Sequence, residues 1–234
     1  MTESSVLTAL VPIPGGSFLM GNDRGRPDER PAHRVALPPF RAARRPVSNA
    51  EYLRFLQATG HEPPPFLADE RFARPEAPVV GVNWFDAVAY CRWLAEATAI
   101  PFRLPTEAER ELAALGGLAA ADWPWGDASP AARLELAAIA TGDRTHVPTA
   151  LCANGHGLLC MADNVHEWCS DWYDAAYYAR SPEAAPPGPS SGRRRASRGG
   201  SWRHQVKFNR ISARSSLDPS FRYNDYGFRV YADL

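Results

Sequence analysis

Hydrophobic residues recur at helical spacing in the first half of the chain and predict two helices there. In the segment 48–60 the apolar side chains fall on one face, Ser48 can cap the first turn, and Glu51 stands at the capping-box position. The segment 83–99 repeats this design and places Cys91 among the apolar positions. Cys91 is therefore predicted to be a small core residue rather than a nucleophile.

A third helix and two strands are predicted from shorter patterns. The segment 104–117 has Pro105 near its first helical position, Thr106 as a candidate cap and two glycines at its end. The segments 15–21 and 33–40 combine short apolar pieces with glycine or proline, which is typical of strands closed by turns.

Beyond residue 117 the helical pattern nearly disappears. Short apolar pieces rich in tryptophan alternate with turn residues, which predicts small strands and long loops packed by aromatic side chains. The Pro-, Ser- and Gly-rich segment 181–197 is expected to be a surface loop, because a strand pattern resumes beyond it. No repeat or abrupt change in composition divides the chain, so we expect an N-terminal tail at 1–12 and a single domain at 13–234.

The charge balance excludes an overall field that would recruit nucleic acid or a membrane. Lys and Arg together number 26, as do Asp and Glu, and the basic run 192–197 is interpreted as a solvated loop. An N-terminus without a basic region and the lack of a long apolar run predict a cytoplasmic protein, which we expect to be a monomer or a weak oligomer. Its four cysteines are then expected to be reduced, although Cys152 and Cys160 could pair in an oxidising compartment.

Eight short motifs occur in order along nearly the whole chain: GGSFLMG, PVSNAEYLRFL, PVVGVNWFDAVAYCRWL, FRLPTEAERELAA, WPWGD, GLLCMADNVHEW, RGGSW and YNDYGFRV. In this order they resemble the formylglycine-generating enzyme family, also called the sulfatase-modifying-factor family, from about Ile13 to the C-terminus. The resemblance implies an α+β fold of the family's elaborated C-type-lectin-like kind, with two packed helices, few strands and extensive loops. A fold alone does not establish a function.

The family's copper site is not matched by the residues of this chain. The resemblance implies that copper is held by two cysteines just after the equivalent of RGGSW, where the first position is His204 and the second falls near Asn209. No cysteine follows Cys169. Linear ligation of Cu(I) requires two soft sulfur donors, which imidazole and amide groups do not supply. We therefore expect no copper bound in the dithiolate mode and no formylglycine-generating oxidase activity.

The motif DNVHEW resembles one of the family's calcium sites. This resemblance implies Ca²⁺ held by Asn164, the Val165 carbonyl and Glu167, and oxygen donors of this kind suit that ion. The alternative is that Asn164 caps a turn and Glu167 pairs with an arginine. Asp163 replaces the family's usual glycine before Asn164, which either adds a ligand or alters the turn.

A candidate ligand-binding surface surrounds the RGGSW motif. His204 is the leading candidate for a residue that faces the cleft and does chemistry, with Ser201 beside it. A helical turn at HEWC would also bring His166 and Cys169 to one face, where they and His204 could hold a transition metal of unknown identity. The residues that offer aromatic, guanidinium or polar groups to a ligand are Trp168, Ser201, Trp202, Arg203, His204, Asn209, Arg210 and Arg214.

Each part of this surface has a structural alternative. Trp168 and Trp202 are residues of a kind more often found in the core, and Arg214 and Arg229 are expected to pair with buried carboxylates such as Asp171 or Asp225.

Three functions are compatible with these residues. The first is a tailoring enzyme that acts on a peptide or small metabolite, with any metal ligands supplied in part by a partner. The second is a binding module, because variable proteins of diversity-generating retroelements resemble this family and vary the segment that begins near GGSW. The third is an accessory scaffold protein. The expected partner is a peptide, protein or small-molecule ligand.

Overall fold

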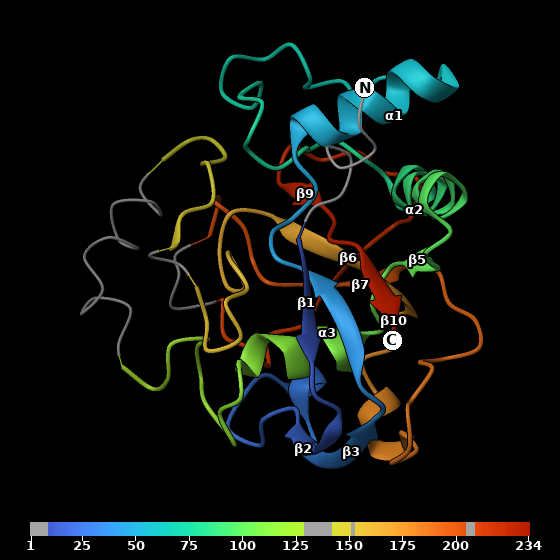
Figure 1. The fold of residues 1–234 in the computed structure, drawn as a ribbon. Helices are drawn as coiled ribbons and strands as arrows, with labels where there is room; N and C mark the ends of the chain where they lie inside the picture. Colours follow the sequence, from blue (N-terminus) through green and yellow to red (C-terminus); the bar gives the residue numbers. More distant parts are fainter. Residues whose placement is uncertain (1–8, 129–141, 151–152, 205–208) are drawn as a thin grey trace.

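The computed structural model describes residues 9–128, 142–150, 153–204 and 209–234. Within them the chain forms a mixed α+β fold in which short strands and three α-helices are joined by long loops (Figure 1). The helices are α1 (Asn49–Thr59), α2 (Trp84–Thr98) and α3 (Glu107–Leu115). None of the described helices is long and apolar enough to cross a bilayer.

Each helix begins at a capping box encoded in its own sequence. The side chains of Ser48, Asn83 and Thr106 each accept a hydrogen bond from the backbone N–H three residues later. The acidic side chain of that later residue accepts a hydrogen bond from the backbone N–H of the cap. Thr106 is the N-cap of α3, as the sequence predicts. Pro105 therefore lies before the helix, whereas the sequence interpretation placed it near the first helical position. All three helices end at a left-handed backbone. This agrees with the sequence patterns at Gly60 and Gly116, whereas the end of α2 at Ala99 had no glycine to mark it.

Strands from both ends of the chain pair with one another. They are β1 (Leu10–Ile13), β2 (Gly16–Met20), β3 (His33–Leu37), β4 (Phe40–Ala43), β5 (Phe102–Arg103), β6 (His166–Trp172), β7 (Arg195–Arg198), β8 (Ser215–Leu217), β9 (Tyr226–Gly227) and β10 (Tyr231–Asp233). One sheet has the order β1-β4-β10-β5, a second has the order β8-β7-β6-β9, and β2 pairs with β3. All pairs are antiparallel except β6 with β9.

The core has two main apolar clusters. One lies under α1 and α2 and includes Trp168 from β6, and the other contains residues of α3, the β2–β3 pair and Tyr231. In Figure 1, α1 and α2 lie toward one end of the molecule and the β2–β3 pair toward the other. Since β6 is held between β7 and β9, its first residues lie next to the turn that follows β7.

Two boundaries differ from the sequence predictions. β1 begins at Leu10, so the last residues of the expected tail 1–12 belong to the first sheet. Pro12 is tolerated there because β1 is an edge strand. β7 begins at Arg195, inside the expected loop 181–197. The Arg195 guanidinium carbon lies 3.9 Å from the ring centroid of Trp84 and 3.5 Å from that of Trp172.

Two cysteine predictions have different outcomes. Cys91 is buried on α2, and burial raises the pKa of its thiol, so its interpretation as a core residue is confirmed. The alternative in which Cys152 pairs with Cys160 in an oxidising compartment involves Cys152, which lies outside the described residues.

Candidate functional site

A pocket of about 180 Å³ lies where the start of β6 meets the turn after β7. Glu167 pairs with Arg198 across the two strands, which brings Gly199 and Gly200 beside His166. The described residues that line the pocket are Arg26, His166, Arg198, Gly199, Gly200, His204, Asn209, Ala213, Arg214 and Ser215. A pocket of this size suits a side chain or a small polar group rather than a large ligand.

His204 is held at this pocket by a short relay of hydrogen bonds. The buried Ser201 hydroxyl donates to Asp225 Oδ2 at 3.1 Å and lies 3.4 Å from His204 Nδ1. Because the hydroxyl gives its single proton to the carboxylate, its oxygen accepts the Nδ1 proton of His204. This tautomer leaves a lone pair on His204 Nε2, the atom that a general base uses.

His166 lies at the back of the pocket as a neutral imidazole. Burial, together with the nearby His204 and Arg26, lowers the pKa of His166 to about 3. The two imidazole rings are 5.1 Å apart between centroids. His166 can therefore accept a hydrogen bond or bind a metal without first losing a proton.

Two buried polar atoms in the pocket wall have no hydrogen-bond partner within the described part of the chain. They are His166 Nδ1 and Asn209 Nδ2. Buried polar atoms are almost always paired, so these two mark where a ligand or an ordered water binds. Arg26 lies at the entrance with 54% of its side chain exposed, and its Nε atom pairs with Glu29 Oε1 at 3.2 Å and lies 3.6 Å from Asp28 Oδ1.

The other two arginines of the pocket are paired in the protein interior. Glu107 accepts hydrogen bonds from Arg198 Nε at 2.9 Å and from Arg214 Nε at 2.7 Å. Burial alone would raise the pKa of Glu107, but the two guanidinium groups hold it below its ordinary value. Arg214 pairs with a buried carboxylate as predicted, but its partner is Glu107 on α3 and not Asp171 or Asp225, the two examples named from the sequence.

The structure brings together some of the predicted ligand-binding residues and separates others. His204, Asn209 and Arg214 line the pocket, and Ser201 supports His204 from below the surface. Arg203 is exposed at the same turn, where it lies 3.8 Å from Asp225.

The remaining three predicted residues have structural contacts. Trp168 is fully buried and donates its indole N–H to the Val82 carbonyl, so its alternative as a core residue is the one that the structure shows. Trp202 packs against Phe72 and also donates to a backbone carbonyl. Arg210 pairs with buried Glu29 at 2.7 Å. None of the three lines the pocket, because each is oriented by a partner elsewhere.

His204 and Asn209, at or near which the resemblance places the family's copper ligands, both line this pocket. Their nitrogen and oxygen donors do not fit linear Cu(I). The alternative metal site of His166, Cys169 and His204 is not formed either. The motif HEWC is strand β6 rather than a helical turn, so His166 and Cys169 point to opposite faces, and the buried thiol lies near the Glu167 carbonyl.

Two of the three expected calcium ligands, Glu167 and Asn164, have other partners in the structure. Both carboxylate oxygens of Glu167 accept hydrogen bonds from Arg110 and Arg229, at distances of 2.8 to 3.2 Å. The Asn164 side chain bonds to both backbone groups of His146. In this arrangement the Glu167 carboxylate is not available to a calcium ion. The contacts are those of the alternative in which Glu167 pairs with an arginine. Calcium at this turn stays a prediction.

The neutral state of His166 gives a testable dependence of stability on pH. The unfolded imidazole takes up a proton below about pH 6.5, whereas the folded one does so only near pH 3. This group therefore stabilises the fold fully above pH 6.5, and its contribution is lost as the pH falls toward 3. When the pH is lowered from 7 to 4.5, we expect the free energy of unfolding of the His166→Phe variant to fall by about 2 to 3 kcal/mol less than that of the wild type.

Urea titrations of both proteins at the two pH values measure this difference. An equal loss in the wild type and in His166→Phe would contradict a buried neutral His166.

Several site residues were missed by sequence reasoning. Arg26 and the Ser201 partner Asp225 lie far from the motif in sequence, and only the fold brings them to it. Two neighbouring glycines with positive φ, Gly199 and Gly200, were the available signal for a close backbone approach.

Sequence comparison identifies relatives over nearly the whole chain. A family model described as the sulfatase-modifying factor enzyme 1-like domain matches residues 2–234. The chain is 35% identical over 284 residues to the formylglycine-generating enzyme of Streptomyces coelicolor, with 95% of this chain and 88% of that enzyme covered. It is also 37% identical over 249 residues to a Chlamydia pneumoniae protein named serine/threonine-protein kinase pkn1. That match covers 98% of this chain but the chain spans only 38% of the length of that protein.

Solved structures share the fold. PvdO from Pseudomonas aeruginosa superposes with a TM-score of 0.79 at 27% identity, over 96% of this chain and 94% of that one. Treponema denticola variable protein 1 has a TM-score of 0.83 at 24% identity, over 100% and 98% of the two chains, and this likeness concerns the fold alone. The family match and the Streptomyces relative both extend over almost all of the sequence. The chain therefore belongs to the sulfatase-modifying-factor family, as its ordered motifs indicate.

Proposed function

We propose that this protein is a tailoring enzyme that acts on a peptide or small metabolite without copper. The observation that carries the proposal is the pocket in which His204, neutral His166 and the unpaired Asn209 amide converge. Sequence and fold place the protein in the family, and the proposal concerns what this pocket does. A cytoplasmic location is part of the proposal.

The chemistry that these residues support is proton transfer. His204 Nε2 takes a proton from the bound ligand and later returns it, while Ser201 and Asp225 keep the other ring nitrogen protonated. Positioned bases of this kind accelerate a reaction by about 10²- to 10⁴-fold. Copper-dependent redox chemistry at this pocket would require additional ligands from a partner, because His204 and Asn209 do not supply the soft sulfur donors of the copper mode.

The pocket favours a small polar ligand with an acidic group. Arg26 is paired with Glu29 and Asp28 but keeps an exposed face, through which its guanidinium can also contact a ligand carboxylate, and Asn209 Nδ2 can donate to a second oxygen. His166 Nδ1 is available to a further polar atom of the same ligand. The free carboxylate of a peptide or of a small acid has this character.

Turnover of a dipeptide library tests the proposal. Wild-type protein is incubated with dipeptides that carry free carboxylates, and products are detected by mass spectrometry. We expect His204→Ala to reduce turnover by about 100-fold or more. His156→Ala is the matched control, since His156 lies outside the pocket and should leave turnover unchanged.

A second arm supplies Cu(I) and a cysteine peptide derived from a sulfatase. We expect no aldehyde product. Aldehyde formation, or full turnover by His204→Ala, would overturn the proposal.

The alternative is a binding module or scaffold, which the exposed turn at Arg203 and His204 favours. In that case a dipeptide shifts the melting temperature of the wild type but is never converted. The variant Asn209→Ala then loses this shift in melting temperature. His204→Ala changes the binding of the dipeptide, and neither the wild type nor the variant converts it.

A further inference from the structure

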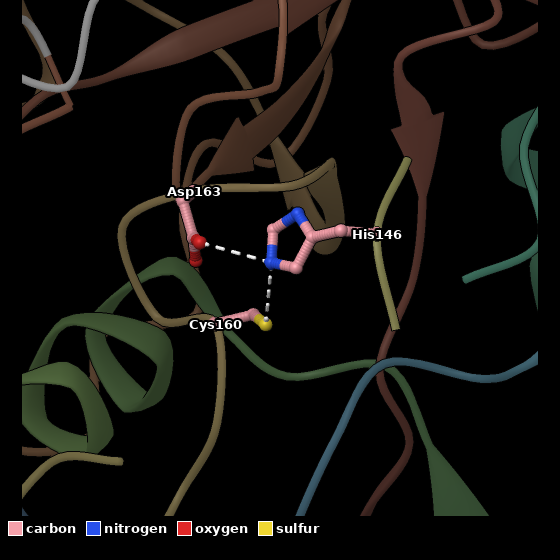
Figure 2. A group of neighbouring side chains, drawn as sticks. All are labelled: His146, Cys160 and Asp163. Atoms are coloured by element: carbon pink, nitrogen blue, oxygen red, sulfur yellow. Dashed lines mark hydrogen bonds and ion pairs between the residues drawn. The ribbon is translucent and has the colours of Figure 1, made fainter. Parts of the chain in front are cut away.

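A second group of polar side chains lies outside the pocket, in the loop that precedes β6. Cys160 and Asp163 come from this loop, and His146 comes from the described segment 142–150 (Figure 2). His146 Nε2 lies 3.2 Å from Asp163 Oδ2 and 3.7 Å from Cys160 Sγ. The three donor atoms all lie within 4.8 Å of one another, and the proposed pocket chemistry uses none of them.

The two separations from His146 Nε2 are close to those expected around a tetrahedral metal ion. With zinc bonds of about 2.0 Å to nitrogen and oxygen and about 2.3 Å to sulfur, tetrahedral angles put the nitrogen and oxygen about 3.3 Å apart. The same geometry puts nitrogen and sulfur about 3.5 Å apart. Figure 2 shows the His146 ring pointing between the other two side chains, so a small movement admits an ion at their centre.

The Asp163 carboxylate provides a second, independent observation. Asp163 is only 5% exposed, and its Oδ2 atom accepts no hydrogen bond from the described residues, although His146 is close to it. A buried anion is costly unless a positive charge compensates it. A divalent cation bound at Oδ2 supplies that charge.

The residues around the cluster hold its ligands in place. Fully buried Asn164 donates to the His146 carbonyl at 2.9 Å and to Cys160 Sγ at 3.7 Å, and its Oδ1 accepts from the His146 N–H at 3.2 Å. Both Cys160 and Asn164 have positive φ, at 57° and 73°. Non-glycine residues adopt this backbone only where the surroundings impose it, which is common at functional sites.

We propose that His146, Cys160 and Asp163 form a binding site for a divalent transition metal of the zinc class. A thiolate, an imidazole and a carboxylate suit Zn²⁺, Co²⁺ or Fe²⁺ rather than the hard ions Ca²⁺ and Mg²⁺. Asn164 acts as the positioning residue that orients two of the ligands. Three protein ligands leave a fourth position for water or another ligand, and the His146 side chain is 18% exposed, so the cluster is not sealed from solvent.

Titration with Co²⁺ tests this site directly. The full chain is purified, reduced and freed of metal, and Co²⁺ is added alone while the near-ultraviolet thiolate-to-cobalt absorption is recorded. We expect one equivalent to produce this band and Zn²⁺ to remove it. The band should be absent in Cys160→Ser and retained in Cys91→Ala, which removes a buried thiol from the core of α2 instead.

A second readout covers the case in which Cys160→Ser fails to fold. Asp163→Asn keeps the thiolate, so it should keep the band. The Co²⁺ concentration that gives half of the full band should rise by about tenfold or more. Zn²⁺ should raise the melting temperature of the wild type more than that of Asp163→Asn.

Three results would overturn the site. They are the absence of the thiolate band in reduced wild type, the same band in Cys160→Ser, or a disulfide between Cys152 and Cys160 in protein whose thiols are alkylated at lysis.

Discussion

The substitution Glu167→Gln is expected to lower the free energy of unfolding by about 3 to 5 kcal/mol. Glu167 is fully buried between Arg110 and Arg229, which are also buried, and it accepts four hydrogen bonds from them. Burial would raise the pKa of Glu167, but the two guanidinium groups hold it below its ordinary value. Glutamine has the same shape but no charge, so it leaves two buried cations without their anion.

Denaturant titration at neutral pH measures this loss. The matched control is Asp69→Asn, which removes a carboxylate of an exposed ion pair with Arg71 at 2.6 Å. Exposed pairs contribute little, so the control should leave the midpoint nearly unchanged. Equal shifts in both variants would show that the two arginines do not depend on the Glu167 charge.

The same pair of proteins tests calcium at this turn. If Glu167 binds calcium, EGTA lowers the melting temperature of the wild type and has no effect on Glu167→Gln. The ion pairs with Arg110 and Arg229 instead predict that EGTA leaves the wild type unchanged. Calcium content of the purified protein, measured by mass spectrometry, gives an independent answer.

The helices were predictable because their signals are local. The caps at Ser48, Asn83 and Thr106 and the apolar periodicity depend on residues within about four positions of one another. The strands of the second half were predicted only as a class. The parallel pairing of β6 with β9 joins segments 60 residues apart, such as His166 and Tyr226, and no local spacing encodes it.

The site was predictable only in part for the same reason. His204 follows directly from its place after the RGGSW motif, and it does line the pocket. Glu107 looked like an ordinary acidic residue of a first helical turn, yet the fold buries it against Arg198 and Arg214. Asp163 was visible as a departure from the family pattern, but its neighbour His146 could be identified only once the loops were placed.

The substitution Gly200→Ala is expected to cost about 2 to 4 kcal/mol and to abolish turnover of the dipeptide library. Gly200 has a φ of 67°, and a Cβ atom there would lie 2.0 Å from Asn209 Cγ. Both residues line the pocket, so the added methyl group must displace the Asn209 amide from the wall. The loss in the free energy of unfolding therefore has two sources, the left-handed backbone at residue 200 and the steric contact with Asn209. The steric contact also changes the shape of the ligand site.

Gly60→Ala separates these two parts. Gly60 has the same φ of 67° at the end of α1, but a Cβ there would meet nothing within 4 Å. It should show the backbone cost alone, about 1 to 2 kcal/mol, with turnover unchanged. Since Asn209→Ala removes the clashing atom, the double variant Gly200→Ala/Asn209→Ala should recover the steric part of the stability but not the turnover. Identical unfolding free energies for Gly200→Ala and Gly60→Ala would mean that the pocket wall yields without cost, and the tight approach of Gly200 to Asn209 would then have no role in shaping the site.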